Sequence, residues 1–423
     1  MSSKPYAQIG SSYGSFGTHR EYIKAGTGII DEHWSFDARL SRIASDGYIE
    51  RASADLKSYY LQAAYYNNNS AIKFITFAGN EETYHAWNYA SKEEMEQYGR
   101  RYNSCGYMYT DDNGRDHYYN DQIDNYIQTN YQLLFDHSFG NGLSMNLGLH
   151  YTKGDGYYQE YKTSRKLIEY ALHPFEFNGE TIKKSDLVRK KAMDNHFGGA
   201  IFSLNYKNNR INATIGGALN RYDGDHFGNV LWVKNYIGNL NATHEYYRNN
   251  GTKDDGNIYF KADYTIQKGL NAYLDLQYRH IGYTIKGCND KWNDAENSLQ
   301  KMDIDETFDF FNPKAGMSWQ IDRHNRIFAS VSMAHKEPTR NNYTDGKLHE
   351  HPKAERLIDY ELGYSFAKGI FNAGANLYFM DYKDQLVLTG ELNEIGEPLA
   401  ANIPKSYRAG IEFTAGLQLP CGF

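Results

Sequence analysis

The residues best suited to binding a ligand are aromatic side chains gathered in one long polar segment, residues 79–124. Flat rings hold ring-bearing ligands by stacking, but the same rings also pack a loop against its neighbours. The sequence favours neither interpretation over the other. The candidate ligand contacts are Tyr84, His85, Trp87, Tyr89, Tyr107 and Tyr109.

Two other polar segments could attract a metal ion, and neither has convincing ligand spacing. His349-Glu350-His351 places two imidazoles near a carboxylate, but neighbouring side chains alternate direction in extended backbone. The acidic segment 290–305 could likewise attract a cation. For both we favour a solvated loop, so the sequence predicts no metal site and no cofactor.

The remaining reactive groups form no catalytic pattern. Cys105, Cys288 and Cys421 have neither CxxC nor zinc-ligand spacing. A disulfide between Cys105 and Cys288 is possible, although unpaired thiols are the favoured interpretation. The chain contains no GxSxG, HExxH or phosphate-binding loop, so we predict that it is not an enzyme. Its net charge of −7 gives no basic footprint for nucleic acid.

The elements that position these residues are strands, because apolar and polar residues alternate throughout the chain. The alternation is clear in residues 143–152 and again in residues 358–366, 371–380 and 407–414. A period of two indicates strands with one apolar and one polar face. We count about sixteen such strands, whose connections alternate between short turns and long polar segments.

The most economical fold is an all-β antiparallel transmembrane barrel with short periplasmic turns and long extracellular loops. No run of 18 apolar residues predicts a membrane helix, and barrel strands keep the mean hydropathy low, here −0.74. A β-sandwich or propeller also alternates, but neither usually has short connections on one rim only. Tyrosine and tryptophan at strand ends suggest a membrane-interface girdle, as at Trp34, Tyr151, Tyr206 and Trp319.

The polar faces of these strands should then point into the barrel. Charges of both signs there suit a wet channel or a polar plug, and they would be costly against lipid. The residues expected to face the lumen include Asp275, Gln277, Arg279, Arg408 and Glu412.

Several runs resemble TonB-dependent outer-membrane receptors, in the order of that family's barrel strands. YAQIGSSYGSFGTHR near the N-terminus resembles the family's first barrel strand. The later matches are FFNPKAG at 310–316, SMAHKEPTR at 332–340, ERLIDYELGY at 355–364, YFMDYKDQLV at 378–387 and NIPKSYRAGIE at 402–412.

This resemblance implies uptake of a scarce ligand, such as a ferric siderophore or related iron complex, across the outer membrane of a Gram-negative bacterium. Partners would be the TonB complex, reached through an N-terminal plug region, the iron complex and outer-membrane lipid. The family's barrel has 22 strands. We therefore expect residues 1–423 to be a partial barrel domain, with the plug, the TonB-binding motif and the C-terminal strands absent.

Two alternatives remain open at this stage. A complete passive porin would also close with sixteen strands, and the terminal Phe423 is a residue such barrels often end on. Pro420 and Gly422 weigh against it, because both weaken a pairing strand. The other alternative is an outer-membrane barrel enzyme or adhesin, which lacks support from any nucleophile–base pair.

Overall fold

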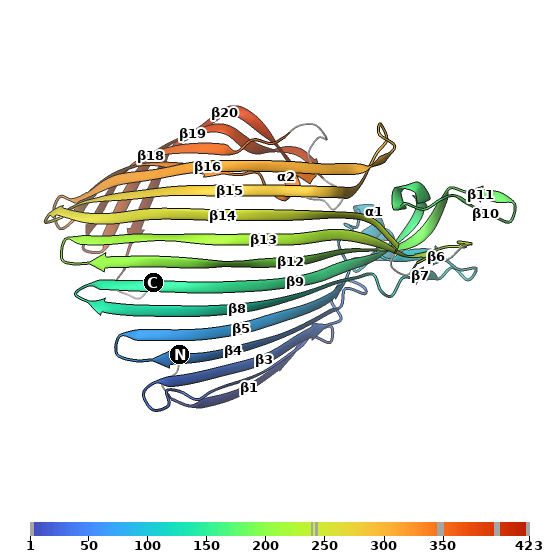
Figure 1. Cartoon of the computed structure of the whole chain (residues 1–423), viewed down its shortest axis with the longest axis horizontal. Coiled ribbons are helices and arrows are strands. Elements are labelled where there is room, and N and C mark those ends of the chain that lie inside the picture. The colour runs from blue at the N-terminus through green and yellow to red at the C-terminus, as the bar shows by residue number, and fades with distance from the viewer. Residues whose placement is uncertain (1–3, 238–239, 242–243, 345–350, 393–397, 420–423) are drawn as a thin grey trace.

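The computed structural model describes residues 4–237, 240–241, 244–344, 351–392 and 398–419, and one antiparallel sheet of sixteen strands dominates it (Figure 1). Its strands, in spatial order, are β1 (Tyr6–Tyr13), β2 (His19–Gly26), β3 (Trp34–Ser45), β4 (Ala54–Tyr66), β5 (Ser70–Tyr84), β8 (Ile123–Gly140), β9 (Leu143–Lys166), β12 (Lys184–Lys207), β13 (Ile211–Val233), β14 (His244–Gln267), β15 (Leu270–Asn293), β16 (Ser298–Gln320), β17 (Asn325–Lys336), β18 (Glu355–Lys368), β19 (Phe371–Leu392) and β20 (Pro398–Leu417). The all-β prediction and the number of strands are confirmed.

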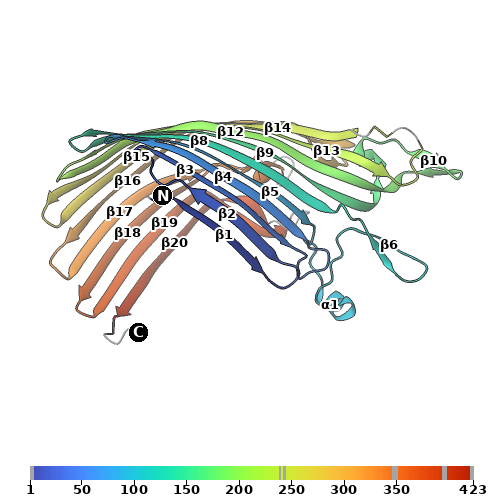
Figure 2. The same ribbon diagram turned by 90° about the horizontal axis from the view of Figure 1, so that it is seen from below.

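The sheet curves into an arch, which Figure 2 shows from below. Each strand pairs with the next in the spatial order, and β1 and β20 form the two edges. Among the described residues, no pairing joins β1 to β20. The arch therefore has a concave inner face and a convex outer face, as the wall of a barrel has.

Alternation decides which side chains lie on each face. On β9, Leu147, Leu149 and Tyr151 are between 40 and 46% exposed, although they are apolar. Their neighbours across the strand pairs are also apolar, for example Leu133 opposite Leu149. A continuous apolar surface of this kind on the outer side of a sheet is what contact with lipid requires.

The short turns at one rim have the chemistry that two-residue hairpins demand. In the turn between β8 and β9, Asn141 and Gly142 have φ values of 51° and 79°. Both values fit a type I′ turn, which favours Asn-Gly. A Cβ at position 142 would lie 1.9 Å from the carbonyl oxygen of Lys207, so only glycine fits there.

At the other rim the strands are much longer than their alternation predicts. The strand read from residues 143–152 continues to Lys166, and the strand read from residues 200–206 begins at Lys184. The segment 290–305, predicted to be a solvated loop, is the tip of the β15–β16 hairpin. That prediction is wrong, because backbone pairing between the two strands continues after the apolar face has ended.

The long connections fold into small elements at this same rim. They are α1 (Lys92–Tyr98), the hairpin of β6 (Tyr107–Thr110) and β7 (Asp116–Tyr118), the 3₁₀ helix η1 (Leu167–Tyr170) and the hairpin of β10 (Phe175–Phe177) and β11 (Glu180–Ile182). The 3₁₀ helix and the β10–β11 hairpin pack on a buried apolar cluster that includes Leu187, Val230 and Tyr246. This rim therefore contains a compact core outside the apolar band.

A further segment crosses the inner face of the sheet. Helix α2 (Arg340–Thr344) follows β17 and places Tyr343 against Ile285, Met302 and Ile304 on β15 and β16. Neither α1 nor α2, the α-helices in the described part of the chain, is long and apolar enough to cross a membrane.

Candidate functional site

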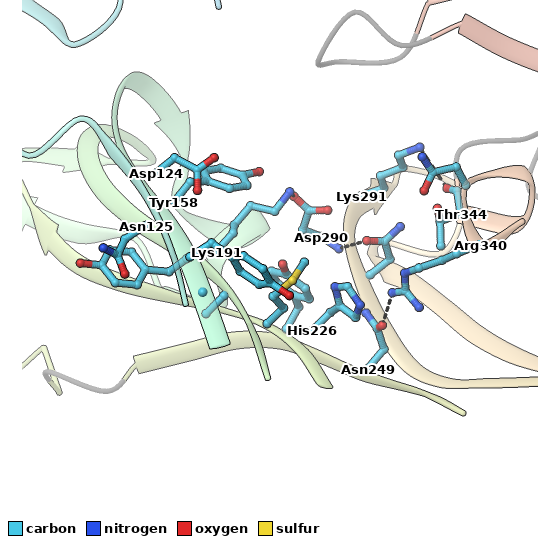
Figure 3. A pocket seen from close by; sticks show the side chains of 18 of the residues that line it. Asp124, Asn125, Tyr158, Lys191, His226, Asn249, Asp290, Lys291, Arg340 and Thr344 are labelled. Atoms are coloured by element: carbon cyan, nitrogen blue, oxygen red, sulfur yellow. Dashed lines mark hydrogen bonds and ion pairs between the residues drawn. The ribbon is translucent and has the colours of Figure 1, made fainter. Parts of the chain in front are cut away.

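A pocket of about 490 Å³ opens on the inner face at the long-loop rim (Figure 3). One side comes from β8 and β9, through Asp124 and Tyr158, and the centre from Lys191 of β12 and His226 of β13. The tip of β15 also reaches the centre with Asp290, and helix α2 forms the far side with Arg340. The strand register explains the grouping, since Tyr158 lies opposite both Asp124 and Lys191 in neighbouring strand pairs.

An ion pair divides the pocket. Lys191 Nζ lies 2.6 Å from Asp290 Oδ2, and both side chains are largely buried. Burial opposes the charge on each group, but the attraction between them outweighs it. The pKa of Lys191 is therefore raised and the pKa of Asp290 lowered, so both groups are charged at neutral pH.

A second buried pair supports the first from behind. Arg189 Nε donates to Glu160 Oε2 at 2.8 Å, and Arg189 Nη1 donates to the hydroxyl of Tyr170 at 3.3 Å. The same guanidinium lies 3.8 Å from Asp290, which links the two pairs. Burial raises the pKa of Glu160, but the charges of Arg189 and Lys162 together outweigh burial and hold that pKa below its usual value.

Two of the six predicted aromatic contacts reach the edge of this pocket. His85 and Trp87 are in contact as tilted rings with centroids 3.8 Å apart, and Trp87 meets the pocket residue Tyr158 edge-on at 5.4 Å. His85 is 3% exposed, and neither ring nitrogen has a hydrogen-bond partner in the described structure. Burial lowers the pKa of His85 to about 4, so its ring is neutral at physiological pH.

The other four lie elsewhere at the rim. Tyr84 is the last residue of β5, and its hydroxyl donates to the carbonyl of Tyr119 in the following loop at 2.9 Å. Tyr89 is 92% exposed. Tyr107 and Tyr109 belong to the β6–β7 hairpin, which projects from the rim (Figure 2) and where Tyr109 stacks on His117. The structure thus places the six residues in four different environments.

A second cavity lies within the packed loops at this rim. About 300 Å³ of space lies between Trp87, Cys105 and Glu160. Cys105 is buried, which raises the pKa of its thiol, and Cys105 and Cys288 are both free cysteines. Cys421 is outside the described residues.

The expected polar-face residues share the inner side of the sheet with helix α2. Arg279 lies on the same face of β15 as Ile281 and Ile285, and its guanidinium forms ion pairs with Asp255 and Glu337. Gln277 accepts a hydrogen bond from Asn312 at 3.1 Å. Asp275 and Gln277 follow the same period on β15, as Glu412 and Arg408 do on β20, where Arg408 lies over the ring of Tyr382.

No metal centre forms in the described part of the chain, where no three His, Cys, Asp or Glu residues converge on one point. Of the predicted His-Glu-His motif, His349 and Glu350 lie outside the described residues. His351 Nδ1 lies 3.1 Å from Glu306 Oε1.

The residues at the centre of the pocket could not be identified from the sequence. Lys191, His226, Asn249 and Asp290 lie on strand segments where both faces are polar, so no period marked them. Arg340 lies at the end of a run that matched a family strand, and its position over another strand could not be read from it. Only the register of the sheet brings them together.

A sixteen-stranded antiparallel wall, with an apolar outer face, tight turns at one rim and a polar pocket at the other, defines the chain as an outer-membrane β-barrel protein. Residues 64–420 match the family described as TonB dependent receptor-like, beta-barrel, and the chain belongs to that family. It is therefore a protein of the Gram-negative outer membrane, in a family of transporters rather than enzymes.

Solved structures agree on the fold. The Escherichia coli K12 ferric-catecholate import receptor Fiu matches with a TM-score of 0.64 at 12% identity, covering 99% of this chain and 63% of Fiu. The Yersinia pestis ferric yersiniabactin uptake receptor FyuA matches with a TM-score of 0.64 at 12% identity, covering 98% and 58%. The copper transporter OprC matches with a TM-score of 0.68 at 11% identity, covering 99% and 59%.

The chain therefore spans less than two thirds of the length of these receptors. No curated protein matches the sequence.

Proposed function

We propose that the chain is barrel wall from an active importer, which takes up a ferric siderophore or a related iron complex with force from the TonB complex. The observation that carries this proposal is the pocket on the inner face at the long-loop rim. A passive pore selects by the width of a constriction, whereas convergent rings and charges suit capture of one ligand. Family membership favours the same choice over the passive-porin and barrel-enzyme alternatives.

Aromatic rings and cations favour a metal complex over a bare metal ion. Tyr158 and Tyr247 line the pocket with their rings, and Trp87 lies against Tyr158. Arg340 offers positive charge, whereas the charge of Lys191 is paired with Asp290. A bare cation would be held instead by converging carboxylate, imidazole or thiolate ligands. Two of the similar proteins are named for ferric complexes and another for copper, so the ligand has to be tested directly.

Energy would come from outside this part of the protein. By the family resemblance, the TonB complex engages an N-terminal plug region, and residues 1–423 form only the partial barrel around it. The polar inner face, with Asp275, Arg279 and Glu412, would line the route of the ligand.

The test is uptake by cells that carry the complete gene. Radioactive iron supplied with the siderophores of the native organism should accumulate in iron-limited cells, and deletion of TonB should abolish the accumulation. Equal accumulation without TonB would rule out energised import. Trp87→Ala should weaken ligand binding, while Tyr89→Ala, an exposed tyrosine outside the pocket, serves as the matched control.

A further inference from the structure

Arg340 is held firmly at one end of the pocket by its own helix. Three residues later Tyr343 is 7% exposed, packed against Ile285, Met302 and Ile304 on the inner face of the sheet. Lys291 Nζ also donates to the carbonyl of Thr344 at 3.0 Å. These contacts fix α2 on β15 and β16, so the position of Arg340 is set before any ligand arrives.

Two residues on β14 prepare the place that the guanidinium occupies. Asn249 is 1% exposed, and its Nδ2 donates to the carbonyl of Cys288 at 2.8 Å. This bond orients Asn249 so that its Oδ1 accepts from Arg340 Nη2. At Gly251 a Cβ would lie 3.2 Å from Arg340 Nη1, so the glycine leaves room for the arginine.

No carboxylate among the described residues compensates the charge of Arg340. Its hydrogen-bond acceptor, Asn249, is a neutral amide, and the carboxylates of the described residues all lie beyond ion-pair distance of the guanidinium. The other central cation, Lys191, is neutralised by Asp290. His226 lies between them, where burial, followed by the charges of Arg340 and Lys191, lowers its pKa to about 4 and keeps it neutral.

The opposite end of the pocket has the opposite character. Glu81 and Asp124 both line it there, and burial, with the neighbouring Glu81 charge, raises the pKa of Asp124. Figure 3 shows Asp124 and Arg340 at the two ends, with Lys191 and Asp290 between them. The pocket is therefore polarised along its length.

We propose that Arg340 is the specificity-determining residue of this pocket and receives an oxyanion of the ligand, such as a carboxylate. The inference rests on the proposed function and adds the charge of the ligand to it. An anionic metal complex fits this end, whereas a cationic complex or a bare metal ion would meet an unpaired guanidinium. A planar guanidinium also suits an oxyanion because it can donate two parallel hydrogen bonds.

The experiment measures binding to the purified full-length receptor with two probes of opposite charge, ferric citrate and ferrioxamine B. We compare the wild type with Arg340→Gln, which removes the charge, and Arg340→Lys, which keeps it. Arg221→Gln is the matched control, because Arg221 is exposed on the outer face and paired with Asp254. Thermal unfolding of each variant verifies that it is folded.

The expected result is that Arg340→Gln weakens ferric citrate binding about tenfold, the usual size of one charged hydrogen bond. Arg340→Lys should retain most of the affinity, and Arg221→Gln all of it. Ferrioxamine B should bind more weakly than ferric citrate and should not lose affinity in Arg340→Gln.

The inference is overturned if the wild type fails to bind ferric citrate, if Arg340→Gln binds it as well as the wild type, or if both probes lose affinity equally. The proposed function has a separate readout, the TonB dependence of iron uptake in cells. If the receptor binds ferric citrate through Arg340 but cells accumulate iron equally without TonB, the Arg340 subsite stands and the proposed TonB-driven import is wrong.

Discussion

The two halves of the wall obey opposite rules of burial. In the half near the tight turns, apolar side chains such as Leu133 and Leu149 lie exposed on the outer face, where lipid covers them. In the half near the long loops, Leu187 and Val230 are completely buried beneath η1 and the β10–β11 hairpin. The first half uses the membrane as its solvent, and the second builds a core of its own in water.

Charge follows the same division. Beyond the apolar band, Arg189, Glu160, Lys191 and Asp290 are buried together and paired. Because such groups are stable only as a set, the outer half depends on a few contacts, whereas the membrane half depends on the repetition of its strands. The two halves should therefore respond differently to the same kind of substitution.

Loss of Arg189 is expected to have the largest effect. Arg189→Met leaves Glu160 buried without its main partner, which typically costs about 3–5 kcal/mol. Hydrogen exchange should rise in β9, β12 and the β10–β11 hairpin, while the membrane half stays protected. If the outer half kept its protection, the buried pair would not be what holds it together.

An apolar truncation should separate the two halves further. Leu187→Ala opens a cavity in the outer core and should cost about 2–5 kcal/mol. Leu149→Ala on the lipid face should cost clearly less, since lipid chains fill the space. Thermal unfolding in the same detergent compares the two, and equal losses would contradict the division.

A charge on the lipid face tests the membrane half directly. Leu133→Arg should destabilise the folded protein by about 2–4 kcal/mol in lipid vesicles, if the residue lies near the midplane. The neighbouring residue Gln132 lies on the inner face, so Gln132→Arg should be tolerated. A similar cost for both variants would show that the outer face is not in contact with lipid.

Acid should loosen the outer half first. Glu160 and Asp290 have pKa values lowered by their partners, so their stabilising contribution is complete above the unfolded-state pKa and is lost as the pH falls through the folded-state value. Hydrogen exchange at the long-loop rim should increase below about pH 4. Glu160→Gln should reduce the dependence of hydrogen exchange on pH. If exchange at the rim did not change with acid, the two carboxylates would not stabilise this half.

The smallest effect is expected on the outer surface. Arg221 and Asp254 form an ion pair in which both side chains are more than half exposed. Arg221→Ala should change stability by less than about 1 kcal/mol, because water screens such pairs. Thermal unfolding compares this variant with Arg189→Met. Both lose an arginine from an ion pair, so the difference between their stability losses measures the effect of burial.

The same division explains what could be predicted from the sequence. Lipid on one side and polar contents on the other impose a period of two, so every strand of the membrane half was found. In the outer half both faces are polar, as around Asp155 and Asn249, and the period disappears although the pairing continues. One missed element did leave a local signal, since Ser91 and Glu94 form a capping box at the start of α1.

The candidate site was harder to predict than the fold. The aromatic loop was a sound place to look, and His85 and Trp87 do lie beside the pocket. The charged residues that complete it come from β12 to β15 and from α2, which are far apart in sequence. Their meeting depends on strand register and on where Tyr343 docks, and neither is encoded locally.

The length of the central strands has a consequence for the journey of a captured molecule. A strand of 24 residues, such as β9, is about 80 Å long, and at a usual tilt it rises about 60 Å, against an apolar band about 25 Å tall. A molecule resting between Lys191 and Arg340 would have travelled none of the membrane thickness. Binding at the pocket and transport across the membrane are therefore separate steps. A substitution on the periplasmic side of the pocket would leave ligand binding intact while it blocks transport.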